Sequence, residues 1–105
     1  MKKELVIYET KEGKAPFQEW LEHLRDRKAR AIIRVGLDRL AYGYTGRCES
    51  VGDGVHELKI HFGPGYRVYF GQLKNSLIIL LCGGDKRSQN RDIANARKLW
   101  REYLA

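Results

Sequence analysis

The sequence contains only two cysteines, two prolines and no long apolar run, and these shortages exclude several classes of protein. Cys48 and Cys82 are too few for a disulfide framework and lack the spacing of metal ligands, so we expect reduced thiols in a cytoplasmic protein. No apolar stretch reaches the ~18 residues that a membrane-spanning helix needs. The start, Met1-Lys2-Lys3, leads straight into a short strand, which is not the pattern of a secretory signal.

The charge of the chain is positive and unevenly distributed. Lys and Arg outnumber Asp and Glu by 20 to 13, which gives a net charge of +7. Residues 57–105 carry 9 basic and 4 acidic side chains, a net of +5, whereas residues 1–56 carry 11 and 9, a net of +2. We therefore expect the C-terminal half to face a polyanion, with RNA as the leading candidate. The charge excess alone fits a solvated surface or an acidic protein partner equally well.

The length and the apolar pattern predict a single α+β domain over residues 1–105. Residues 4–9 are typical of a strand, Pro16 suits the first turn of a helix, and Asp26 can cap a second helix. The sheet is expected to resume near residues 47–51, and a last helix to run from about Ser88 to Leu104. The predicted order is β-α-α-β-β-β-α. It gives a small antiparallel-rich sheet with an N-terminal helical hairpin on one face and a C-terminal helix.

Consecutive strands are predicted between Val55 and Leu81, and their alternation determines which side chains can meet. If Gly63-Pro64-Gly65 forms a three-residue loop, His61 pairs with Arg67 and Lys59 pairs with Tyr69. Phe62 would then face Tyr66. This register predicts one open, cationic face, to which the end of the next strand adds two more basic residues. The predicted face carries Lys59, His61, Arg67 and Tyr69, joined by Lys86 and Arg87.

Such a set of cations could cleave a phosphodiester bond without a metal. When an RNA 2′-hydroxyl attacks the adjacent phosphate, negative charge develops there, and fixed cations lower the barrier. Lys59 could act as the general base, and Arg67 suits bidentate contact with phosphate. Simpler interpretations stay open. The cations and His61 could be ordinary surface residues, and Gly83-Gly84 could form a strand-to-helix turn rather than a phosphate cradle.

Three segments carry a family resemblance: Leu58-Lys59-Ile60-His61, Gly63-Pro64-Gly65-Tyr66-Arg67-Val68-Tyr69-Phe70 and Cys82-Gly83-Gly84-Asp85-Lys86. Residues 15–21 and 89–93, together with Trp100, fit the same pattern. The chain resembles the toxin half of type II toxin–antitoxin modules. Within them it is similar to the RelE/ParE superfamily, in the HigB-like or phage Gp49-like branch often called "addiction module killer protein".

The resemblance implies an endoribonuclease that cleaves mRNA on the ribosome, uses no cofactor or metal, and is neutralised by an antitoxin, often a helix-turn-helix protein. Carried over to this sequence, the catalytic residues would be Lys59, Arg67, Lys86 and His61, and the RNA-binding residues Arg87, Tyr69 and Arg91.

Two departures from the family pattern leave other functions open. Glu57 stands where RelE-like enzymes tend to have a second lysine, and the terminal Tyr-His pair of HigB-like proteins is missing. The acid that protonates the leaving oxygen is therefore unassigned, with His61 as the candidate. The alternatives are a ParE-like inhibitor of DNA gyrase and a catalytically silent binding module.

Overall fold

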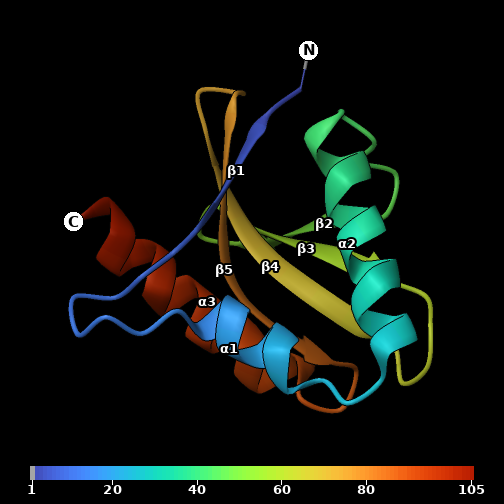
Figure 1. The fold of residues 1–105 in the computed structure, drawn as a ribbon. Coiled ribbons are helices and arrows are strands. Elements are labelled where there is room, and N and C mark those ends of the chain that lie inside the picture. The colour runs from blue at the N-terminus through green and yellow to red at the C-terminus, as the bar shows by residue number, and fades with distance from the viewer. Residues whose placement is uncertain (1) are drawn as a thin grey trace.

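A mixed five-stranded sheet forms the centre of the computed structural model, which describes residues 2–105 (Figure 1). In chain order, the elements are β1 (Glu4–Ile7), α1 (Pro16–His23), α2 (Arg27–Ala41), β2 (Cys48–Gly52), β3 (Val55–Ile60), β4 (Tyr66–Leu73), β5 (Leu77–Asp85) and α3 (Gln89–Leu104). The α+β class is confirmed. Four strands follow the helical hairpin, one more than the predicted order lists; the first, β2, lies near residues 47–51, where the sequence predicted that the sheet resumes.

The strands lie in the order β1-β5-β4-β3-β2. β2 to β5 form an antiparallel meander, whereas β1 runs parallel to β5 at the edge of the sheet. The long segment between β1 and β2 contains both N-terminal helices, and these cross one face of the sheet before the meander begins. The predicted helical hairpin is therefore present on one face.

Local signals explain where these two helices begin. Pro16 occupies the first turn of α1, where its missing N–H removes no helical hydrogen bond. The Asp26 side chain accepts hydrogen bonds from the backbone N–H groups of Lys28 and Ala29, which confirms it as the cap of α2. Apolar side chains from both helices form a core with the near face of the sheet: Phe17, Leu21, Ile33, Leu37, Leu40, Leu58, Ile60, Val68, Phe70, Ile78 and Leu80.

The opposite face of the sheet is covered by α3. Ala96, Leu99 and Trp100 are buried there in a second core with Val55, Tyr69, Ile79 and Leu81. The sequence predicted that this face would be open, and that expectation is wrong. Because the apolar stripe of a 16-residue helix must itself be buried, α3 lies on the only large sheet face that α1 and α2 leave uncovered.

Glycines in the strands allow the helices to approach the sheet closely. A Cβ atom added at Gly71 would overlap the Trp100 ring of α3, and one at Gly83 would overlap the Trp20 ring of α1. Gly84 lies under Asp92 in the first turn of α3. Gly83 and Gly84 are thus strand residues packed beneath helices on opposite faces, and the turn that the sequence assigned to them begins only after Asp85.

Candidate polyanion-binding site

The β3–β4 hairpin positions two of the predicted cations directly opposite each other. Lys59 pairs with Arg67, and Glu57 pairs with Tyr69. The predicted register is wrong by two residues, because the loop spans residues 61–65 rather than three glycine-proline positions. A shift of two preserves the face of every side chain, so the prediction that Lys59 and Arg67 share a face is confirmed.

Glycine conformations account for the longer loop. Gly63 and Gly65 both have positive φ angles, 55° and 80°, which other residues adopt only with strain. The backbone N–H of Phe62 donates to the carbonyl of Ile60, and that of Gly65 donates to the carbonyl of Phe62. The chain therefore leaves β3 one residue before His61. His61 is exposed in the loop and is not paired with Arg67 as predicted.

The face that carries Arg67 is not open, because α3 covers part of it. Tyr69 is fully buried in the second core, so its ring cannot stack on an RNA base as the sequence suggested. Burial, followed by a hydrogen bond to Glu57, raises the pKa of the Tyr69 hydroxyl above its ordinary value of 10.0. The Arg67 side chain retains 12% of its exposure. Tyr69 therefore belongs to the core, and Arg67 lies at its edge.

A buried carboxylate organises this edge. Glu57 is 1% exposed, and its Oε2 accepts hydrogen bonds from the Tyr69 hydroxyl at 3.0 Å and from Gln89 Nε2 at 2.8 Å. Arg67 Nε lies 3.8 Å from the same oxygen. Three elements, β3, β4 and the first turn of α3, therefore meet at one carboxylate oxygen.

The Arg67 guanidinium makes one hydrogen bond within the hairpin. Nη1 donates to the Gly65 carbonyl at 2.6 Å. Nε lies 3.8 Å from Glu57 Oε2 and is buried without a hydrogen-bond partner among residues 2–105. The buried Nε is not accessible to a phosphate, so the bidentate contact that the sequence predicted would have to use the two Nη nitrogens.

Lys59 and Lys86 flank Arg67. Lys59 Nζ forms an ion pair with Glu49 at 3.0 Å, and 28% of the Lys59 side chain and 64% of the Glu49 side chain are exposed. A pair this exposed contributes only ~0–1 kcal/mol, so a phosphate can replace the glutamate at little cost. A Cβ atom added at Gly65 would contact both Arg67 and Lys86, which places Lys86 beside the hairpin loop. The structure thus brings Lys59, Arg67 and Lys86 to one edge of the sheet.

The turn between β5 and α3 displays further positive charge. The Asp85 carboxylate accepts hydrogen bonds from the backbone N–H groups of Arg87 and Ser88, at 2.9 and 3.3 Å. Asp85 therefore caps this turn. Arg87 and Arg91 are both exposed, and either can reach a polyanion without rearrangement of the core.

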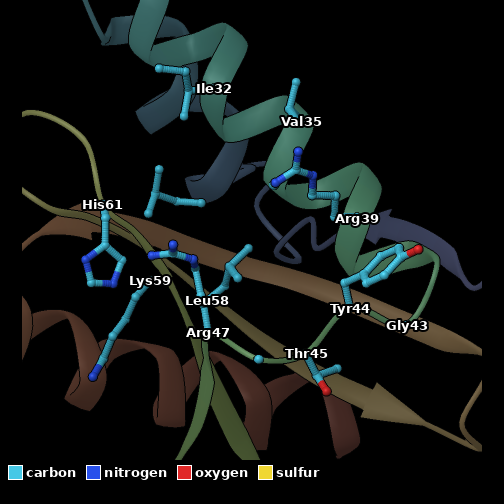
Figure 2. Close-up of a pocket in the computed structure, with 13 residues that line it drawn as sticks. Ile32, Val35, Arg39, Gly43, Tyr44, Thr45, Arg47, Leu58, Lys59 and His61 are labelled. Atoms are coloured by element: carbon cyan, nitrogen blue, oxygen red, sulfur yellow. The ribbon is translucent and has the colours of Figure 1, made fainter.

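A groove of about 890 Å³ lies on the other side of β3, between that strand and α2 (Figure 2). Its floor is apolar and includes Ile32, Val35, Leu58 and Ile60. Figure 2 shows Arg39 and Arg47 pointing into the groove, His61 at one end, and the Lys59 side chain directed away from α2. His61 thus lines this groove and does not pair with Arg67 as the sequence predicted.

Sequence reasoning missed Glu57 and Gln89 as site residues, as well as the groove. The alternation along the strand predicts only that Glu57 shares a face with Lys59, and it cannot show whether a later helix covers that face. Gln89 was noticed only as part of a family motif. Within residues 2–105, no three His, Cys, Asp or Glu side chains come together in a way that could hold a metal ion. None of the described helices is long and apolar enough to cross a membrane.

Comparison with known proteins gives one informative relative. A Haemophilus influenzae protein, named only as an uncharacterized protein, is 45% identical over 86 residues, which cover 82% of this chain and 87% of the relative. The chain belongs to the same family as that protein. No family model matches the sequence, and no solved structure matches it. The name of the relative carries no function.

Proposed function

We propose that this protein is the toxin of a type II toxin–antitoxin module, in the HigB-like branch of the RelE/ParE superfamily, and that it cleaves mRNA on the ribosome. The observation that carries the proposal is the direct pairing of Lys59 with Arg67 across the hairpin, with Lys86 beside Gly65. Three cations from three consecutive segments thus lie near the hairpin end of the sheet, where one phosphate would bind. Exposed Arg87 and Arg91 extend this positive edge along the start of α3.

The chemistry follows from the placement of charge. Attack of a 2′-hydroxyl on the neighbouring phosphate forms a phosphorane with extra negative charge, which the Arg67 guanidinium and the Lys86 ammonium would stabilise. Lys59, once released from Glu49 and deprotonated to the neutral amine, would accept the proton of the attacking hydroxyl. His61 stands outside this group in the structure, so the donor of the proton to the leaving oxygen stays unassigned.

The test is cleavage of ribosome-bound mRNA by single variants, followed by mapping of RNA 5′ ends. Lys59→Ala and Lys86→Ala should each slow cleavage by ~10²–10³-fold, as expected for the loss of one group that stabilises the transition state. Lys98→Ala is the matched control, because Lys98 is an exposed lysine further along α3. If both site variants cleave RNA and arrest growth like the wild type, the nuclease proposal is refuted.

The groove between α2 and β3 favours a protein partner as well. Its apolar floor, with Val35 52% and Tyr44 70% exposed, is suited to apolar side chains, and Arg39 and Arg47 are suited to acidic ones. We propose that the antitoxin places an acidic, partly apolar segment here.

Two measurements separate these partners. Val35→Asp should weaken binding of the antitoxin encoded next to the toxin gene, because it adds a negative charge to an apolar floor that faces an acidic segment. Arg34→Asp is the control, since Arg34 is exposed on α2 and does not line the groove.

The alternative, a ParE-like gyrase inhibitor, also needs a protein-binding surface. Inhibition of gyrase supercoiling by the wild type, without RNA cleavage, would favour that alternative.

A further inference from the structure

Glu57 is the one charged side chain that is buried within residues 2–105. Moving a carboxylate out of water is costly, so a buried carboxylate persists only where donors and a cation compensate it. Glu57 has both: hydrogen bonds from Tyr69 and Gln89, and the Arg67 guanidinium 3.8 Å away. A core that only had to be filled would be served as well by an apolar residue, so the charge requires another explanation.

The contacts of Glu57 connect the strand that carries Arg67 to the start of α3. Arg67 has its Nε 3.8 Å from Glu57 and its Nη1 bonded to the Gly65 carbonyl, so both its neighbours are fixed parts of the hairpin. Gln89 is the first residue of α3, and its bond to Glu57 ties the start of the helix to β3. The turn that carries Lys86 and Arg87 lies between β5 and this tied residue, so its position depends on the same carboxylate.

We propose that Glu57 is a positioning residue, which fixes the Arg67 guanidinium and the Lys86 turn relative to each other so that both reach one phosphate. This inference rests on the proposed nuclease function and adds to it a residue that does not touch the substrate. A carboxylate is needed because its Oε2 accepts hydrogen bonds from Tyr69 and Gln89 while its charge balances the Arg67 guanidinium 3.8 Å away. A glutamine oxygen could accept the same two hydrogen bonds, but the neutral amide would leave the arginine charge unbalanced.

The experiment compares Glu57→Gln with the wild type by two independent readouts. Steady-state cleavage kinetics give kcat and KM separately, and a ¹⁵N NMR spectrum follows the Nε–H signal of Arg67, assigned with Arg67→Lys. We expect kcat to fall on the order of 10²-fold with KM little changed, because misplacement of a catalytic group by about 1 Å has that effect. The Arg67 Nε–H proton should exchange with solvent faster, since the group would lose its fixed orientation.

Two further variants keep the result interpretable. Gln89→Ala removes one hydrogen bond but leaves the buried charge, so it should lower kcat less than Glu57→Gln does. If Glu57→Gln does not fold, Gln89→Ala takes its place in the test. Glu22→Gln is the matched control, because Glu22 is an exposed glutamate on α1, and it should change neither readout.

The outcomes distinguish this inference from the function on which it rests. The positioning role is overturned if folded Glu57→Gln has the wild-type kcat and an unchanged Arg67 signal. The same result in Gln89→Ala overturns it if Glu57→Gln does not fold. If the wild type itself cleaves no RNA, the proposed function fails, and the NMR measurement alone then decides whether Glu57 fixes Arg67. A faster-exchanging signal supports the positioning, and an unchanged signal overturns it.

Discussion

Replacement of Arg67 should destabilise the protein, although the sequence alone predicted an exposed residue whose loss costs less than ~0.5 kcal/mol. Arg67 and Glu57 lie 3.8 Å apart, with side chains 12% and 1% exposed. Two charges at this separation attract by about 4 kcal/mol at an effective dielectric constant of ~20, and breaking a buried pair costs ~3–5 kcal/mol. Because part of Arg67 still contacts solvent, we expect Arg67→Met to lower the free energy of unfolding by about 2–4 kcal/mol.

Methionine keeps most of the aliphatic volume of arginine, so the variant chiefly removes the charge. The measurement is urea unfolding at pH 7, followed by tryptophan fluorescence. A loss of about 2 kcal/mol should also lower the melting temperature by roughly 8–16 °C in a domain of this size. The double variant with Glu57→Gln should lose less than the sum of the two single variants, with a coupling of about 0.5–3 kcal/mol.

The chain supplies its own matched control. Arg101 Nη1 lies 3.8 Å from an Asp53 oxygen, the same separation as in the buried pair, but these side chains are 63% and 61% exposed. Arg101→Met should therefore change the free energy of unfolding by no more than ~1 kcal/mol. If Arg67→Met and Arg101→Met cost the same, or if the double variant is additive, the buried pair does not stabilise the fold as argued.

Three further predictions follow from buried groups. Gly71→Ala should destabilise the protein by about 1–3 kcal/mol in urea unfolding, because the added methyl group overlaps the Trp100 ring; an unchanged midpoint would contradict this packing. Alkylation at pH 8 should modify half-buried Cys48 before Cys82, whose pKa burial raises to about 12; equal rates would show that the second thiol is accessible. Burial raises the pKa values of Cys82 and Tyr69, so at high pH unfolding releases a proton from each. The free energy of unfolding should therefore be constant below about pH 9 and fall as the pH rises toward 12. A flat stability curve over that range would be inconsistent with both burials.

Local signals allowed much of the fold to be predicted from the sequence. Pro16 and Asp26 mark helix starts through their own backbone chemistry, and the alternation along β3 is fixed by strand geometry. The shared face of Lys59 and Arg67 could be predicted for the same reason. A register error of two residues did not disturb it, because side-chain direction repeats every two residues.

Features that depend on docking between distant segments could not be predicted. Whether the row of Glu57 and Tyr69 is exposed depends on where α3 lies, and nothing within β3 or β4 encodes that position. The hairpin register depended on the conformations of Gly63 and Gly65, which a turn pattern leaves ambiguous. The sequence therefore predicted the cations of the candidate site but not the buried Glu57 carboxylate beside Arg67.

The parallel pairing of β1 with β5 has a consequence for synthesis of the chain. Glu4 pairs with Leu77, so the strand that leaves the ribosome first finds its partner only when the last strand has been made. Closing so long a loop is slow, and contacts of high sequence separation form late in folding. Until then β1 is unpaired, and the neighbouring charges of Lys2, Lys3 and Glu4 disfavour its pairing with other chains. A nascent chain that stops before β5 would therefore lack both its sheet edge and the strand that leads into Lys86, so it could not assemble the cationic edge.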